Sequence, residues 1–286
     1  MDDVELSLVL VAYEMGRELP RTLASLGRSY QRDMDGCDYE IIVVDNGSRQ
    51  PVRRDDLPDP GVALTFMTME APGPSPVAAA NRGLAAARGR LIGAWIDGAR
   101  MASPGLLATC RAAAAGRERP VIATPNYQLG TVRQAMSDQT GYDQAAEDAL
   151  LAGIGWPQDG YRLFNIATPE DDPQGGALLE SNALFMPAAL YRELGGFDPG
   201  FVSPGGGLAN PDLLTRATAL PSIEFIRIVG EGTFHQIHGG LTTSTRQGAV
   251  DTVKRASLEY VALRGRPPGK VRLPATLFRS PYAPET

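Results

Sequence analysis

Continuous apolar runs of strand length alternate with amphipathic stretches of helical period along the first half of the chain. An uninterrupted apolar run is typical of a strand buried on both faces, and apolar residues at every third or fourth position are typical of a surface helix. The predicted strands span residues 6–13, 40–45, 62–69 and 91–96, and the predicted helices span residues 18–30, 77–88 and 104–115. This alternation predicts an α/β fold with a mostly parallel, Rossmann-like central sheet flanked by helices.

The second half of the chain has a weaker pattern. Residues 131–176 are polar and irregular, and we expect an excursion from the sheet there. Strands are predicted over residues 177–186, 223–229 and 232–237, and helices over residues 188–194 and 250–263. Asn210-Pro211-Asp212 predicts a further helix start, with Asn210 as the N-cap and Asp212 in the first turn. The segment from residue 264 on is rich in proline and basic residues and has no helical pattern.

Polar residues follow three of the predicted strands directly. These strand ends read Tyr13-Glu14, Asp45-Asn46 and Asp97-Gly98. Ligands of parallel sheets bind at the carboxyl ends of the strands, so we expect the three polar tips to converge on one crevice.

Composition excludes some classes of protein. The 286 residues carry a formal net charge of -6, which argues against a nucleic-acid binder. The acidic start runs straight into a strand and the apolar runs are far shorter than a membrane span, so neither a secretory signal nor a transmembrane segment is expected. Cys37 and Cys110 lack metal-type spacing, as expected in a reducing compartment. We therefore expect a cytoplasmic protein, with peripheral contact with a membrane left open.

Several motifs resemble a known family when they are taken in order. Leu6-Ser-Leu-Val-Leu-Val-Ala-Tyr13, Glu40-Ile-Ile-Val-Val-Asp-Asn-Gly-Ser48, Ala79-Ala-Asn-Arg-Gly83 and Leu91-Ile-Gly-Ala-Trp-Ile-Asp97 are followed by Gly195-Gly-Phe-Asp198. Together they resemble a family 2 glycosyltransferase with the GT-A fold, over roughly residues 6 to 240. The resemblance implies a GT-A domain over residues 1–263, with a nucleotide half (1–130) and an acceptor half (131–263), and a separate tail (264–286).

The resemblance also implies roles for individual residues. The ring of Tyr13 would pack on the nucleotide base, and Asp45 would accept a hydrogen bond from that base. Asp97 would face the ribose or a metal ion. The residues implied in binding a nucleotide-sugar donor are Ala12, Tyr13, Glu14, Asp45, Asn81, Asp97 and Arg100.

The chain departs from the family at the Asp-x-Asp motif, which reads Asp97-Gly98-Ala99. Relatives hold a divalent cation, Mn²⁺ or Mg²⁺, with the second Asp, and Ala99 cannot ligate an ion. Three alternatives stand: Asp97 holds metal with His235 or His238, Arg100 offsets the phosphate charge directly, or the site no longer turns over. His238 matches the His-x-Gly-like segment of relatives, which lies near the diphosphate, better than His235 does, and a hydrogen-bonded structural histidine is the alternative. Spacing on a strand would put the two histidines on opposite faces, unless the segment has already become a loop.

A second departure concerns the general base. Inverting relatives use an Asp of an acidic pair before a late helix, and the matching positions are Ala209 and Asn210. The amide of Asn210 cannot take a proton at neutral pH. Asp212 could replace the base if the helix entry were shifted, and otherwise it favours the positive helix end. Glu180 and the pair Asp171-Asp172 are further carboxylates whose position the sequence does not give. A base from another loop, or a retaining reaction without such a base, is an alternative.

These observations favour a glycosyltransferase that moves a sugar from a nucleotide-sugar donor to an unknown acceptor, in glycan or secondary-metabolite assembly, with altered or absent metal dependence. The alternative is a non-catalytic homologue that acts as a binding or scaffolding protein. A nucleotidyltransferase is disfavoured, because Tyr13-Glu-Met-Gly-Arg17 is a poor phosphate loop. The tail could support an oligomer or contact a membrane surface through its basic residues.

Overall fold

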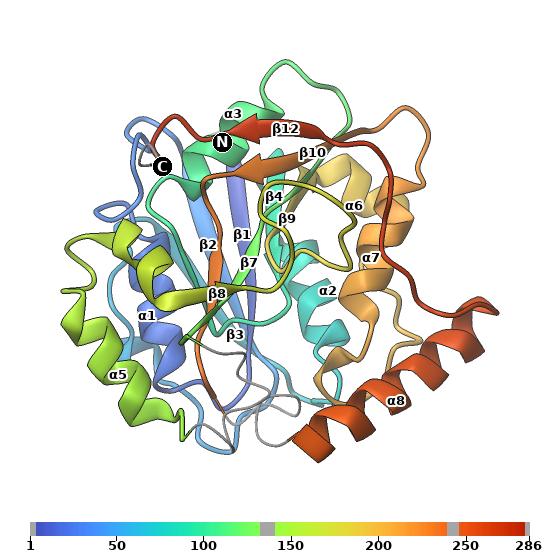
Figure 1. Cartoon of the computed structure of the whole chain (residues 1–286), viewed down its shortest axis with the longest axis horizontal. Coiled ribbons are helices and arrows are strands. Elements are labelled where there is room, and N and C mark those ends of the chain that lie inside the picture. Colours follow the sequence, from blue (N-terminus) through green and yellow to red (C-terminus); the bar gives the residue numbers. More distant parts are fainter. Residues whose placement is uncertain (1–3, 132–140, 239–245, 284–286) are drawn as a thin grey trace.

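The computed structural model describes residues 4–131, 141–238 and 246–283. In this part of the chain a central sheet of eight strands runs through the molecule (Figure 1). In spatial order the strands are β12 (Thr276–Arg279), β10 (Glu224–Val229), β6 (Pro120–Ala123), β9 (Leu184–Pro187), β4 (Leu91–Trp95), β1 (Leu6–Ala12), β2 (Tyr39–Asp45) and β3 (Ala63–Thr68). Neighbouring strands are parallel except around β9, which is antiparallel to β4 and β6. The predicted α/β fold with a mostly parallel sheet is confirmed.

Helices cover both faces of this sheet. One face packs against α1 (Glu18–Leu26) and α3 (Leu106–Ala114), and the other against α2 (Val77–Ala86), α6 (Ala188–Leu194), α7 (Ala209–Thr218) and α8 (Arg246–Arg264) (Figure 1). Along β1, Leu8 and Leu10 belong to the first core, whereas Val9 and Val11 belong to the second. A strand with apolar residues at every position is therefore buried on both sides, which is why its sequence is a continuous apolar run.

A second, smaller sheet extends from the end of the first. Its order is β5 (Arg100–Ala102), β11 (Thr233–His235), β7 (Asn126–Leu129) and β8 (Ala167–Pro169). It shares a separate core with α5 (Gln144–Gly153) and the 3₁₀ helix η3 (Gly160–Ile166), in which Phe234 stacks on Tyr127 at 5.3 Å between ring centroids. Two shorter 3₁₀ turns are η1 (Arg54–Asp56) and η4 (Pro204–Gly206).

Several predicted boundaries are wrong. The helix predicted over residues 18–30 ends at Leu26, and of the strand predicted over 177–186 only β9 exists, because residues 177–183 form a loop. Asn210 is not an N-cap: α7 begins at Ala209 after the N-cap Leu208, so the amide lies inside the first turn. The irregular stretch after residue 130 contains α5, whose N-cap Asp143 accepts a hydrogen bond from the Ala146 backbone N–H at 2.8 Å. Residues 132–140 of that stretch lie outside the described residues.

The segment after residue 264 is held by the central sheet. β12 adds a parallel strand to β10, and Val271 forms an isolated bridge with Leu178. Beyond β12, the buried Ser280 donates a hydrogen bond to Glu231 Oε1 at 2.6 Å. The proline-rich tail is therefore at least in part an element of the fold. Within the described ranges, no helix combines the length and apolar character that a membrane span requires.

Candidate functional site

The carboxyl ends of β1, β2 and β4 meet at one edge of the sheet, as predicted. The Asn46 N–H donates to Ala12 O at 2.8 Å, and the Gly98 N–H donates to Val11 O at 2.8 Å. A Cβ at residue 98 would lie 2.6 Å from Val11 O, so only glycine allows the chain after Asp97 to pass this close to β1.

The turns after β1 and β2 are tied to each other. The backbone N–H of Glu14 donates to Ser48 Oγ at 2.8 Å, and Glu14 Oε1 accepts from the Arg49 N–H at 2.7 Å. Asp45 is buried and its Oδ1 accepts from the Ser48 N–H at 2.7 Å. The side chain of Tyr13 remains 47% exposed beside these turns. Of the predicted nucleotide-binding residues, Ala12, Tyr13, Glu14 and Asp45 therefore lie together, with the aromatic ring of Tyr13 open to a ligand.

Asp97, His235 and His238 form a cluster at the end of β4 and β11. Their ligand atoms lie within 4.8 Å of one another. His235 Nε2 lies 3.1 Å from Asp97 Oδ2 and 3.2 Å from His238 Nε2, and His238 Nε2 lies 3.8 Å from Asp97 Oδ1. Atoms bound to one ion at about 2.0–2.2 Å are themselves about 3–3.5 Å apart. Two of the three separations match ligands of a single cation and the third is slightly longer, so the predicted pair of Asp97 and His238 gains His235 as a candidate ligand.

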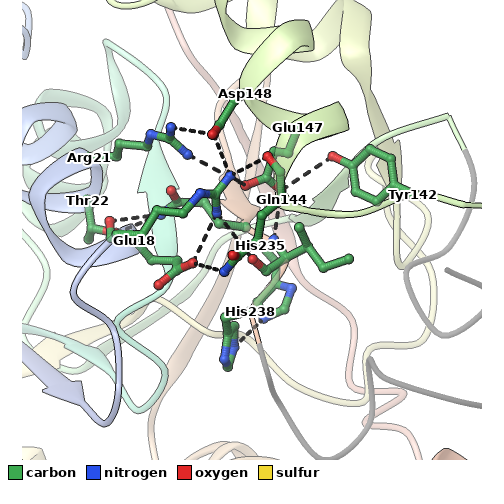
Figure 2. A network of polar contacts seen from close by, with 12 residues as sticks. Glu18, Arg21, Thr22, Tyr142, Gln144, Glu147, Asp148, His235 and His238 are labelled. Carbon is green, nitrogen blue, oxygen red and sulfur yellow. Dashed lines mark hydrogen bonds and ion pairs between the residues drawn. The ribbon is translucent and has the colours of Figure 1, made fainter. Parts of the chain in front are cut away.

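The two histidines are close because the chain leaves strand geometry after His235. β11 ends at that residue, and the next two residues are bound by other elements (Figure 2). Gln236 Nε2 donates to Glu18 O at 3.1 Å, and the Ile237 N–H donates to Glu147 Oε2 on α5 at 2.7 Å. The two histidines would lie on opposite faces only if both belonged to a strand, and His238 lies beyond the end of β11. Gly239 and Gly240, the rest of the His-x-Gly-like segment, lie outside the described residues.

Arg17 completes the support of this segment. Its guanidinium donates to Ile237 O at 3.3 Å and to Glu147 Oε1 at 3.1 Å. Burial raises the pKa of Glu147, although the Ile237 N–H and Arg17 oppose that shift. The network in Figure 2 therefore links α1, α5 and the histidine segment through a buried carboxylate.

The electrostatics of the cluster lower the pKa values of both Asp97 and His238. Burial would raise the pKa of the Asp97 carboxyl, but His235, His238 and Arg100 outweigh it and hold that pKa well below its usual range. Burial lowers the pKa of His238, against the opposing effect of Asp97. An ionised carboxylate and a neutral imidazole are the forms that bind metal ions.

Ala99 and Arg100 follow Asp97 directly. Ala99 is fully buried in the core against α1 and α3, so no ligand could act from this position. Arg100 lies on β5 with its side chain 7% exposed, 3.4 Å from Asp97 Oδ2 through Nε and 3.7 Å from Glu170 Oε2 through Nη1. Neither contact is a hydrogen bond, and among the described residues neither nitrogen has another partner. The guanidinium therefore lies between two carboxylates without a hydrogen bond from Nε or Nη1 to either, and its contact with a diphosphate stays a prediction.

The side chains of Asn81 and Asp212, two other predicted site residues, form hydrogen bonds with other parts of the fold. Both amide atoms of Asn81 bind the backbone of Phe197, with Nδ2 2.8 Å from O and Oδ1 2.9 Å from N. Asp212 is buried between Arg216 and Arg264, and its oxygens accept at 2.6–2.8 Å from both guanidinium groups. Both carboxylate oxygens are thus occupied by guanidinium groups, and the contact links α7 to α8; a role of Asp212 as general base would require these contacts to be given up.

Asn210 has a partner that the sequence could not identify. Its Nδ2 donates to Glu180 Oε2 at 3.0 Å and to Ser181 O at 3.2 Å. Burial raises the pKa of Glu180, and the neighbouring Glu170 adds to the shift, while Arg100 and the Asn210 amide oppose it. The position expected to carry a base therefore holds an amide bound to a carboxylate from the loop before β9.

Comparisons with known proteins support the fold. No protein-family model and no curated protein matches the sequence. Among solved structures, TarS of S. aureus matches with a TM-score of 0.55 and 12% identity over 90% of this chain and 40% of that chain. TarS 1–349 in complex with UDP-GlcNAc matches with the same TM-score and identity over 90% and 66%. The mannosyltransferase PcManGT from Pyrobaculum calidifontis, in complex with GDP-Man and Mn²⁺, matches with a TM-score of 0.53 and 15% identity over 92% and 66%. The chain thus shares its fold with glycosyltransferase structures and spans less than two thirds of their length.

Proposed function

We propose that this chain is a glycosyltransferase that moves a sugar from a nucleotide-sugar donor to an acceptor in glycan or secondary-metabolite assembly. The observation that carries the proposal is the convergence of Asp97, His235 and His238 beside the tied turns of β1 and β2. In folds of this type, ligands bind at that edge of the sheet. The structural neighbours include proteins bound to UDP-GlcNAc and to GDP-Man with Mn²⁺.

Roles follow from position. The exposed ring of Tyr13 packs on the nucleotide base, and Asp45 shapes the turn beside it through its bond to the Ser48 N–H. The diphosphate lies toward Asp97, His235 and His238. A divalent cation held by these three side chains would neutralise the charge that develops on the leaving diphosphate. The chain's own contribution is to hold the three ligands at fixed spacing through the network around Glu147.

The donor set indicates which cation fits. One carboxylate oxygen and two imidazole nitrogens suit a transition metal better than Mg²⁺, which prefers oxygen ligands and retains its waters, and Mn²⁺ is the ion bound in the PcManGT complex. We therefore propose that the reaction depends on Mn²⁺, although Ala99 suggested an altered or absent metal dependence. The alternative is that Arg100, whose Nε lies 3.4 Å from Asp97 Oδ2, offsets the phosphate charge in place of a metal.

Donor cleavage tests the proposal. The full chain is incubated with UDP-GlcNAc, UDP-glucose or GDP-mannose and Mn²⁺, and released UDP or GDP is quantified with water and with sugar acceptors. We expect release from one donor, and its loss when Asp97 is replaced by Ala. A protein that binds none of the donors and releases no nucleotide would favour the non-catalytic homologue.

A further inference from the structure

The loop before β9 carries a carboxylate to the candidate site. β9 pairs antiparallel with β4, with Leu184 opposite Ala94 and Pro187 opposite Leu91. The chain that leads into β9 therefore approaches from the end of β4 where Asp97 lies, and the same register continued would place Ser181 opposite Asp97. Glu180 is thus delivered to the edge of the sheet where the strand tips converge.

This loop is held in a fixed position by neighbouring elements. Ser181 Oγ accepts from the Thr124 N–H at 2.8 Å, and the Asn182 N–H donates to Asn126 Oδ1 at 3.1 Å. On the other side, the Asn210 amide binds both the Glu180 carboxylate and the Ser181 carbonyl. The position of Glu180 is therefore fixed through β7 and α7.

The Glu180 carboxylate itself is only partly occupied. Oε2 accepts from Asn210, whereas Oε1 has no hydrogen-bond partner among the described residues, and the side chain is half-buried. One oxygen is thus oriented by the protein and the other is free to accept a proton. The charged groups that act on it are Glu170, Asp171 and Arg100.

We propose, on the premise of the transferase function above, that Glu180 is the general base that takes the proton of the acceptor hydroxyl. An amide at residue 210 cannot serve as base, but it can orient a carboxylate that does. Burial and the neighbouring Glu170 raise the pKa of the Glu180 carboxyl, which is the direction that favours uptake of a proton.

The proposed step is a single displacement. The acceptor O–H proton passes to a Glu180 oxygen while the acceptor oxygen forms a bond to the anomeric carbon of the donor. The bond between that carbon and the diphosphate oxygen breaks, and its electron pair leaves with the nucleoside diphosphate. Glu180 then returns the proton to water. Attack from the face opposite the leaving group inverts the anomeric configuration.

The test uses full-length wild type, Glu180→Gln and the control Asp171→Asn. Asp171 contributes a neighbouring negative charge and pairs with Lys270 at 3.0 Å, outside the proposed machinery. Each protein is titrated with UDP-GlcNAc, UDP-glucose and GDP-mannose in Mn²⁺ by calorimetry, and nucleotide release with water as acceptor is measured against pH. Circular dichroism checks folding.

We expect Glu180→Gln to bind donor within a few-fold of wild type but to release nucleotide about 100-fold more slowly or worse, as loss of a general base requires. Asp171→Asn should keep the rate at neutral pH, and its acid limb should move to lower pH because one negative charge near Glu180 is gone. Wild-type release by Glu180→Gln would overturn the proposal, as would a wild type that binds a donor and leaves it intact. Loss of donor binding along with release would make Glu180 a binding residue and would also overturn it. A wild type that binds no donor would instead overturn the transferase function itself.

Discussion

Asn210 Nδ2 lies 3.0 Å from Glu180 Oε2, so an amide in the first turn of α7 holds a carboxylate from the loop before β9. The resemblance to family 2 glycosyltransferases expects the carboxylate on the helix. Here the two groups are in contact, but the carboxylate stands on the other segment. Residue 210 therefore lacks the expected carboxylate, but Glu180 places a carboxylate directly beside it.

This contact predicts that the two groups can be exchanged. The double variant Glu180→Gln/Asn210→Asp keeps a hydrogen bond between the segments, with donor and acceptor reversed. The double variant should release nucleotide at least about tenfold faster than Glu180→Gln does. A general base contributes about 10²–10⁴-fold to the rate, so this would be a partial recovery. The measurement is initial-rate release from the donor that wild type cleaves. A double variant as slow as Glu180→Gln would count against a base at this location.

The cluster of Asp97, His235 and His238 predicts a preference among cations. His235→Ala and His238→Ala should each weaken Mn²⁺ binding by more than about 100-fold, since even outer partners of metal ligands contribute 10–100-fold. Electron paramagnetic resonance titration of the full chain measures free Mn²⁺ directly. Wild type should bind Mn²⁺ more tightly than Mg²⁺, measured by competition. Equal Mn²⁺ affinity in wild type and both variants would show that the histidines are not ligands.

Glu147 predicts an effect on the metal without being a ligand. Its carboxylate accepts hydrogen bonds from the Ile237 N–H at 2.7 Å and from Arg17 at 3.1 Å. Ile237 directly precedes His238 in the chain. Glu147→Ala should lower Mn²⁺ affinity by about 10–100-fold, because the histidine segment loses its anchor.

The matched control is Asp148→Ala. Asp148 binds Arg17 at 2.6 Å in the same network but is 50% exposed and does not touch the histidine segment. This control should leave the Mn²⁺ affinity close to that of wild type. Equal losses in the two variants would contradict an anchoring role for Glu147.

The sheet could be predicted from sequence because its signals are local. The apolar runs of β1, β2 and β4 and the polar tips at Tyr13, Asp45 and Asp97 need only a few consecutive residues to be recognised. The fold class and the convergence of the strand ends follow from them.

The cluster could be predicted only in part, because it depends on distant contacts. Glu147 binds Ile237 across 90 residues, and this bond turns the chain so that His235 and His238 meet. Asn210 and Glu180 are 30 residues apart, on either side of β9 and α6. The N-cap predicted for Asn210 relied on local preference, and the contact with Glu180 overrode it.

The tail predicts an effect on stability. Ser280 Oγ donates to Glu231 Oε1 at 2.6 Å, and burial raises the pKa of that carboxyl. Ser280→Ala should lower the free energy of unfolding by about 1.5–3 kcal/mol, the range for hydrogen bonds to charged groups. Leu277→Ala, on the same segment but with its side chain 52% exposed, is the control and should cost less. Urea denaturation measures both. An unchanged midpoint for Ser280→Ala would contradict the docking of the tail.

The measurement that tests the central claim most directly is calorimetric titration of the full chain with UDP, GDP and dTDP, each with Mn²⁺ and again with EDTA. The account predicts that one nucleotide binds in Mn²⁺, and that binding is lost in EDTA and in His238→Ala. Binding that survives EDTA would contradict a metal site at Asp97, His235 and His238. It would favour the alternative in which Arg100 offsets the phosphate charge without a metal ion. No binding of any nucleotide would contradict the glycosyltransferase assignment itself.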